Sequence, residues 1–323
     1  MHRLLALLLI PALWTPGLAA QESERTGMTA EVLWSLDRLG SPVVSPDGTQ
    51  VVVPVTRFDE DNESETRLWL LQAGKERGQR PLTVSGAMAS SPVFSPDGRQ
   101  LAFISKREDD DAGQIYLLPM TGPGEATRLT EIPTGASGLR WAGDYLYFVS
   151  ATWPGLTWEE MAERIEAEDE DHVSAMAWSE MPYAYFDHYI DEARDNHLYR
   201  IPAAGGTIEG ITQPAGLALP RSDAGGGDYD VSPDGRLVAF VVDSNAGGVY
   251  PNLDVYLLEP GEDSAKNLTP DNPASDTAPQ FAPDGKTLAY ERQRIEGFYG
   301  DQAKLMLYSL SGGETRMLPE TWD

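Results

Sequence analysis

The feature that most constrains this chain is a tetrapeptide, Ser-Pro-Asp-Gly, that recurs at a fixed interval. It occupies 45–48, 95–98 and 232–235, and a variant, Ala-Pro-Asp-Gly, occupies 282–285. Each copy is followed by a short apolar run. Asp47 and Asp97 are 50 positions apart, and so are Asp234 and Asp284. A period of this size is typical of repeat proteins, so each copy marks one structural unit.

The tetrapeptide has the chemistry of a turn. Proline presets the backbone angle of its second position, aspartate tolerates the third, and glycine accepts the left-handed conformation at the fourth. A turn between two apolar runs joins two strands into a hairpin. The repeated aspartates are therefore interpreted as turn formers rather than as metal ligands or catalytic groups.

Each unit contains four strand-like runs, which predicts an all-β chain folded as a β-propeller of four-stranded blades. Five blades are visible and the propeller is expected to be incomplete. Their predicted bounds are 41–84, 85–130, 131–212, 213–269 and 270–320. The third blade lacks the tetrapeptide and carries an insertion at about 152–196. The first half of that insertion predicts a helix, because Trp158, Met161 and Ile165 are spaced for one face.

The N-terminus predicts an exported protein. His2 and Arg3 precede an apolar run, and small residues follow at Gly17, Ala19 and Ala20, so residues 1–20 are interpreted as a signal peptide. The run is short for a membrane span, and we expect none after cleavage. The expected location is the periplasm. A helix is predicted at 28–40, between the signal peptide and the propeller at 41–323.

Composition excludes several classes of function. The formal net charge is −27, from 51 acidic and 24 basic residues, so neither nucleic acid nor an anionic membrane is an expected partner. The sequence has no cysteine, which excludes disulfides, thiolate zinc sites and cysteine nucleophiles.

The sequence resembles the propeller half of the prolyl oligopeptidase family of serine peptidases, in its bacterial dipeptidyl/acylaminoacyl-peptidase branch. The resemblance is carried by the helix beginning at Met28 that leads into SPVVSPDG, by the repeated SPDG, by Phe186–Tyr189 ahead of Asn196–Tyr199, and by the closing MLPETWD. It implies a propeller of seven or eight blades followed by an α/β-hydrolase domain. It also implies removal of dipeptides or acyl-amino acids from the N-terminus of short peptides.

A nucleophile elbow requires Gly-x-Ser-x-Gly, and no match occurs: Ser137 is followed by Leu139, and Ser311 is preceded by Ser309. We therefore expect no catalytic residue in this chain. It is interpreted as a substrate-gating, non-catalytic N-terminal fragment that should be inactive alone. Short peptides would be its substrates only through a C-terminal hydrolase domain absent here.

Few residues are candidates for binding chemistry. The resemblance implies that Glu159 and Glu160 bind the free amino terminus of a substrate, since a carboxylate pair suits an ammonium group. A solvated acidic helix face is the alternative. No metal site or cofactor is predicted, because the acidic loops at 59–65 and 108–111 lack the calcium-loop pattern. The histidines are interpreted as packing or loop residues: His2, His172, His188 and His197.

Two other classes of function stay open. One is a TolB-like periplasmic interaction propeller without enzyme activity. The other is a carbohydrate-acting propeller enzyme, which needs a carboxylate pair in the central channel. A downstream segment containing Gly-x-Ser-x-Gly would favour the peptidase, and a natural stop codon after Asp323 would count against it.

Overall fold

The computed structural model describes residues 27–59, 61, 63–75, 78–84, 88–107, 109–170, 177–178, 184–185, 188–189, 193–221, 224–246 and 250–318. The predicted signal peptide lies outside these residues. Two units are distinguished, one ending at Leu36 and one beginning at Asp37. Among the described residues, no helix is both long enough and apolar enough to cross a membrane.

The first unit contains the short helix α1 (Ala30–Trp34), whose N-cap Thr29 accepts a hydrogen bond from the Val32 amide. The helix predicted at 28–40 is thus correct in kind but too long. Arg38–Leu39 form strand β1 instead, paired with Thr56 and Val55. Residues 38–39 gain backbone hydrogen bonds to β3, and this pairing prevails over the helix that the spacing of Leu33, Leu36 and Leu39 would favour.

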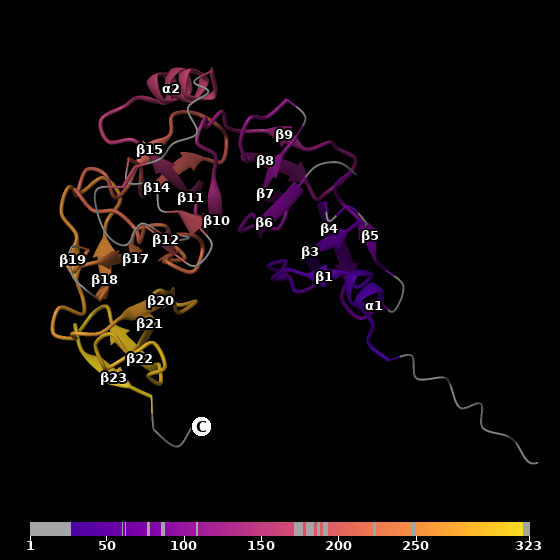
Figure 1. The fold of residues 1–323 in the computed structure, drawn as a ribbon. Coiled ribbons are helices and arrows are strands. Elements are labelled where there is room, and N and C mark those ends of the chain that lie inside the picture. The colour runs from indigo at the N-terminus through magenta and orange to yellow at the C-terminus, as the bar shows by residue number, and fades with distance from the viewer. Residues whose placement is uncertain are drawn as a thin grey trace, which may run out of the picture. The chain divides into compact units, whose positions relative to one another are not determined.

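The second unit consists of successive antiparallel sheets, which confirms the predicted all-β class with four-stranded blades (Figure 1). Five blades lie among the described residues. Blade one also contains β1, so that both β1 and β2 pair with β3. The strands of the five blades are, in chain order, β1 (Arg38–Leu39), β2 (Val43–Val44), β3 (Gln50–Phe58), β4 (Ser64–Gln72) and β5 (Arg80–Pro81); β6 (Met88–Phe94), β7 (Gln100–Lys106), β8 (Gln114–Pro119) and β9 (Thr127–Arg128); β10 (Ser137–Ala142), β11 (Tyr145–Thr152), β14 (Asp195–Pro202) and β15 (Glu209–Gly210); β16 (Tyr229–Val231), β17 (Val238–Asp243), β18 (Leu253–Leu258) and β19 (Lys266–Asn267); and β20 (Asp276–Phe281), β21 (Thr287–Arg292), β22 (Lys304–Ser309) and β23 (Thr315–Met317).

The tetrapeptide forms the turn between the first and second strands, as predicted. In the first copy the Ser45 hydroxyl donates to the Asp47 carboxylate (2.6 Å) and accepts from the Gln50 amide, while Asp47 accepts from the Thr49 amide. Gly48 has φ +70°, which glycine adopts without strain. These hydrogen bonds lower the pKa of Asp47, the serine contact first. The aspartate is fully used by the turn, which supports its structural interpretation.

Each of the first four blades ends in a threonine, and the structure shows what these threonines do. The Thr130 hydroxyl accepts a hydrogen bond from the Ile115 amide (2.9 Å), and Thr212 accepts from the Leu198 amide (3.1 Å). Thr83 and Thr269 do the same for Leu68 and Val255. The hydroxyl replaces a ladder bond where the short outer strand ends, so a buried amide on the third strand keeps a partner.

Neighbouring blades are held together by apolar cores between their sheets. Blades one and two share Leu68 and Phe103, and blades two and three share Ile115 and Phe148. Blades three and four, and blades four and five, share equivalent clusters. Because side chains alternate between the two faces of a strand, each inner blade buries both faces, one against the preceding blade and one against the following blade.

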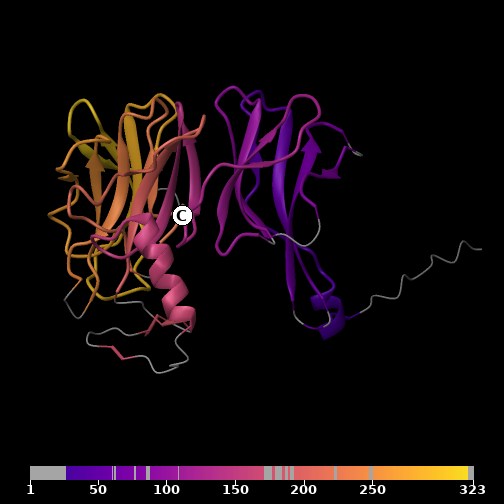
Figure 2. The ribbon, with the colours of Figure 1, turned by 90° about the horizontal axis from the view of Figure 1, so that it is seen from above.

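The predicted helical insertion is present in blade three. Helix α2 (Trp158–Glu170) follows β11, and a short hairpin of β12 (Ala184–Tyr185) and β13 (His188–Tyr189) precedes β14. Met161 is buried and Trp158 and Ile165 are half-buried, so the predicted apolar face is the packed one. In Figure 2 the helix stands beside the strands and extends past their ends.

Candidate functional site at the insertion helix

The first turn of α2 is fixed by a capping box. The Glu160 carboxylate accepts hydrogen bonds from the Thr157 amide (2.8 Å) and the Thr157 hydroxyl (2.9 Å), and that hydroxyl accepts from the Glu160 amide (3.3 Å). The reciprocal bonds satisfy amides that a helix start leaves without partners. They also lower the pKa of Glu160, with the backbone contact to Thr157 the largest cause. Glu160 is therefore occupied in holding the helix.

Aromatic side chains attach α2 to the blade. The Trp158 ring lies 5.0 Å from the Tyr199 ring on β14, and Tyr199 stacks on Phe148 of β11 at 5.8 Å. Burial raises the pKa of Tyr199 to about 12, and its hydroxyl is within 2.8 Å of the Thr152 hydroxyl. The buried Trp153, just before the helix, has the Arg164 guanidinium 4.7 Å from its ring. The start of the insertion is thus placed by packing.

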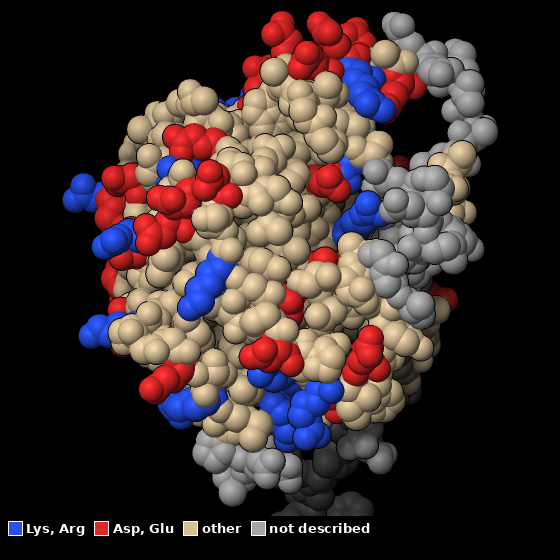
Figure 3. Space-filling model, turned by 90° about the vertical axis from the view of Figure 1, so that its left-hand side faces the viewer, with Lys and Arg blue, Asp and Glu red and all other residues tan. Residues whose placement is uncertain are grey.

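The predicted carboxylate pair is brought to the first turn of α2, but its two members differ. Glu160 closes the cap, whereas Glu159 is exposed and makes no such contact with Thr157. Further acidic residues follow along the helix, and Figure 3 shows acidic side chains gathered at the top of that view, where α2 lies. Glu159 is the member of the pair that is available to a ligand. The Thr-x-x-Glu spacing of the capping box was readable in the sequence and would have separated the two roles.

The loops between the second and third strands lie at the same end of the blades as the insertion, opposite the tetrapeptide turns, because the strands are antiparallel. In blades four and five these loops expose Tyr250, Phe298 and Tyr299. The Asp301 carboxylate accepts hydrogen bonds from the Arg294 and Ile295 amides (2.6 and 3.1 Å), which orders the loop of blade five. This end therefore presents aromatic side chains on structured backbone.

The acidic loops contain internally bonded carboxylates. Asp59 accepts hydrogen bonds from the Asp61 and Glu63 amides, and Asp110 accepts from the Tyr116 hydroxyl at 2.6 Å and from Arg128 at 3.0 Å. Within the described part of the chain, no group of three or more acidic, histidine or cysteine side chains is placed to hold a metal ion.

Of the four histidines, His2 and His172 lie outside the described residues, and His188 is part of β13. His197 is buried on β14, with its Nδ1 atom 3.1 Å from the Thr212 hydroxyl. The equivalent residue of blade two is Gln114, which accepts from the Thr130 hydroxyl at 3.0 Å. His197 therefore fills a position that belongs to the blade architecture, in line with the packing interpretation of the sequence.

We expect His197→Gln to remove a pH dependence of stability. Burial lowers the pKa of His197 from its ordinary value of 6.5, although Asp195 partly opposes this. Below pH 6.5 the histidine of the unfolded chain is protonated, whereas that of the folded chain stays neutral until a lower pH. The free energy of unfolding therefore falls as the pH falls. Glutamine does not titrate and keeps the hydrogen bond to Thr212. Urea unfolding at several pH values below neutrality should show a smaller acid loss for the variant; equal losses would contradict this account.

No protein-family model matches the chain. It is 27% identical over 300 residues to a protein of Porphyromonas endodontalis named dipeptidyl-peptidase 5, covering 89% of this chain and 41% of that protein. The chain spans less than half the length of such relatives, with 46% covered in the protein of that name from Arthroderma otae.

Solved structures share the fold. The β-propeller domain of the Trilobed protease from Pyrococcus furiosus, described as having an open velcro topology, matches with a TM-score of 0.57 at 14% identity, over 89% of this chain and 73% of that one. A TolB from Agrobacterium tumefaciens matches with a TM-score of 0.51 at 18% identity, over 87% and 80% of the two chains. At these identities the structures establish the propeller fold and no more.

Proposed function

We propose that the chain gates and orients short peptides for a hydrolase domain elsewhere in the same protein. The premise is that the chain is the β-propeller part of a prolyl oligopeptidase-type peptidase. The observation that carries the proposal is the combination of dipeptidyl-peptidase relatives, which align with nearly the whole chain, and an insertion helix rigidly anchored at one end of blade three. The complete enzyme would remove dipeptides from the N-termini of its substrates.

Glu159 is proposed as the group that binds the free amino terminus of the peptide. Its neighbour Glu160 fixes the helix start, so that the Glu159 backbone is held in place while its side chain remains exposed. An ammonium group gains from such a carboxylate through a charge-assisted hydrogen bond. A blocked N-terminus lacks the charge, which favours dipeptidyl over acylaminoacyl substrates for this site.

Export to the periplasm is part of the proposal and is supported by the sequence of residues 1–20. The TolB-like interaction propeller remains the alternative function. It has support from the fold, whereas the dipeptidyl-peptidase relatives favour the peptidase.

The proposal is tested in the product of the full reading frame, with a dipeptidyl anilide and its N-acetylated counterpart. We expect the free form to be hydrolysed and Glu159→Gln to raise its KM by about tenfold or more, in keeping with the loss of a charged hydrogen bond. Glu163→Gln, an exposed change one turn further along α2, is the matched control and should have little effect.

Equal effects of the two substitutions would assign the loss to general charge rather than to Glu159. An unchanged KM in Glu159→Gln would remove its assigned role. The 323-residue chain alone should show no turnover, and activity abolished by a serine-reactive inhibitor in that chain would contradict its non-catalytic assignment.

A further inference from the structure

The insertion of blade three leaves the sheet and returns to it at one point. Strands β11 and β14 are paired in register as far as Thr152 with Asp195, so Trp153 and Arg194 are the next two residues across the two strands. After Trp153 the chain turns away from the sheet at Gly155, which has φ +77°. We call Trp153 and Arg194 the neck of the insertion, because they begin and end it.

The ring of Trp153 connects the neck to helix α2. The guanidinium carbon of Arg194, across the neck, lies 5.0 Å from the centre of the ring, and that of Arg164, in the second turn of α2, lies 4.7 Å from it. Trp153 is only 4% exposed. A cation beside an indole ring is attracted by it, and the attraction is strongest where water is excluded. One side chain therefore ties together the beginning, the helix and the end of the insertion.

Trp153 serves through its ring rather than through its N–H group. The Nε1 atom is buried, and among the described residues it has no hydrogen-bond partner. A buried donor without an acceptor costs free energy, so hydrogen bonding does not account for a tryptophan at this position. What the side chain supplies is an aromatic face for Arg164 and Arg194. Another aromatic residue should therefore replace it better than an aliphatic one.

The contact with Trp153 holds a different part of α2 from the contacts described above. Trp158 and Met161 pack in the first turn of the helix, whereas Arg164 lies in the second. The Arg164 Nε atom also donates a 2.9 Å hydrogen bond to Glu168, one turn further along. The side chains of that ion pair are 45% and 55% exposed, and exposed pairs contribute little to stability. The ring of Trp153 is thus what connects Arg164 to the sheet.

We infer that Trp153 is a positioning residue, which holds α2 against blade three so that the Glu159 carboxylate stays where it can meet the amino terminus of a peptide. The inference rests on the proposed function in its role for Glu159. The capping box of Thr157 and Glu160 fixes the start of the helix, but it does not fix the helix against the sheet. Because binding geometry is sensitive to shifts of about 1 Å, a small rotation of α2 is enough to misplace Glu159. Trp153 acts through the helix and touches no substrate.

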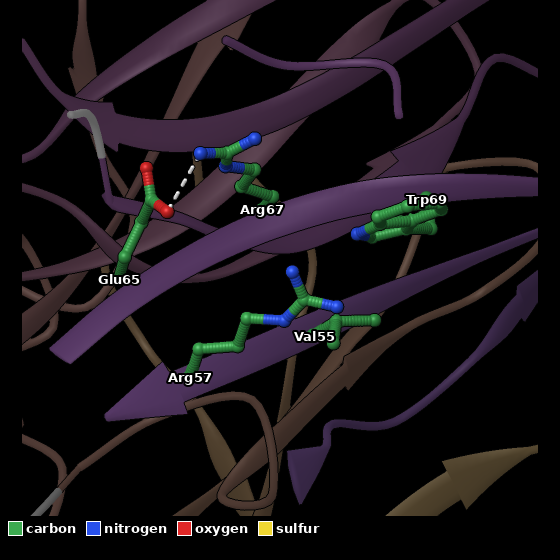
Figure 4. A pocket seen from close by; sticks show the side chains of 5 residues that line it. All are labelled: Val55, Arg57, Glu65, Arg67 and Trp69. Carbon is green, nitrogen blue, oxygen red and sulfur yellow. Dashed lines mark hydrogen bonds and ion pairs between the residues drawn. The ribbon is translucent and has the colours of Figure 1, made fainter. Parts of the chain in front are cut away.

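Blade one supplies a matched tryptophan for comparison. Trp69 on β4 lies in a pocket with Arg57 and Arg67 (Figure 4). In this pocket the Arg67 guanidinium is bonded to the Glu65 carboxylate at 2.8 Å, as Figure 4 shows. Trp69 belongs to a blade that does not carry the insertion. Trp69→Leu therefore removes a tryptophan from an arginine-containing site without changing the contacts of Trp153.

Hydrogen exchange of the peptides from α2, in the product of the full reading frame, measures the anchoring. Trp153→Leu should raise the exchange rate of α2 at least about fivefold, because the helix loses a cation–π contact that is shielded from water. Trp153→Phe keeps an aromatic face and should stay close to the wild type, and Trp69→Leu should leave α2 unchanged. If Trp153→Leu fails to fold, Arg164→Met takes its place. Glu168→Gln is then the control, because it removes the ion pair and leaves the ring contact.

Kinetics with the dipeptidyl anilide measure the positioning. Trp153→Leu should raise the KM about threefold to tenfold, and Trp153→Phe should restore most of the loss. In the Glu159→Gln background, Trp153→Leu should add little, since the helix no longer carries the group that it positions. A residue that served the fold alone would lower the activity by the same factor in both backgrounds.

Unchanged exchange of α2 in Trp153→Leu would overturn the inference, and so would equal kinetic factors in the two backgrounds. The two measurements also separate the inference from the proposed function. A raised KM in Glu159→Gln with no effect of Trp153→Leu would retain the proposed function and reject the inference. Faster exchange of α2 in Trp153→Leu with an unchanged KM in Glu159→Gln would reject the role of Glu159 and its positioning, and would leave Trp153 as an anchor of the helix only.

Discussion

Replacement of Asp276 by alanine should destabilise the chain by about 3–5 kcal/mol, the range for removing one partner of a buried ion pair. Asp276 is 0% exposed at the start of β20, and its carboxylate accepts a 2.7 Å hydrogen bond from the Arg292 guanidinium and a 2.9 Å bond from the Asn272 amide. Burial raises the pKa of Asp276, and these partners oppose the rise. Alanine would leave the mostly buried Arg292 guanidinium without its carboxylate partner, whereas the Asn272 amide would keep the Ala274 and Gln293 carbonyls as acceptors.

Chemical denaturation followed by circular dichroism measures the loss. Asp276→Asn is the matched control, because it keeps an acceptor of the same shape and should cost less than alanine. The double variant Asp276→Ala with Arg292→Met should recover part of the stability, since no unpaired charge remains. A double variant as unstable as the sum of the two single variants would show that the ion pair itself contributes nothing.

The network around Asp276 also shows where sequence reasoning stops. Nothing in the spacing of Asn272, Asp276 and Arg292 distinguishes them from surface residues, because their contacts depend on the pairing of β20 with β21. The tetrapeptide, by contrast, was predictable because its hydrogen bonds are local: Ser95 reaches Asp97, and Asp97 reaches the Arg99 amide. Propeller class and blade count followed from that local chemistry and its period.

The candidate site divides in the same way. The helix around Glu159 and Glu160 is predictable from apolar spacing, and the capping box with Thr157 is an equally local signal. The attachment of α2 through Trp158 and Tyr199 was not predictable, since it joins side chains about 40 positions apart.

Gly138→Ala should push blades three and four apart and lower the free energy of unfolding by about 2–5 kcal/mol. The loss combines the strain of a left-handed backbone conformation with a steric clash. Gly138 has φ +59° at a bulge in β10, and an added Cβ would lie 2.5 Å from the Gly226 amide nitrogen and 2.8 Å from the Gly225 carbonyl carbon. Both contacts are backbone atoms that cannot rotate away. The Tyr229 hydroxyl donates to the Gly138 carbonyl at 2.5 Å, so a shift of this strand would also break a partly buried hydrogen bond.

Two positions separate the clash from the strain. Ser91 and Ala278 occupy the same bulge in blades two and five with φ +48° and +51°, so this backbone conformation accepts a side chain in those blades. Gly235→Ala, at φ +72° with its nearest contact at 3.5 Å, should cost only about 1–2 kcal/mol. If urea midpoints of the Gly138 and Gly235 variants fall equally, strain alone accounts for the loss; a clearly larger fall at Gly138 shows that the approach of Gly225 and Gly226 sets the distance between the two blades.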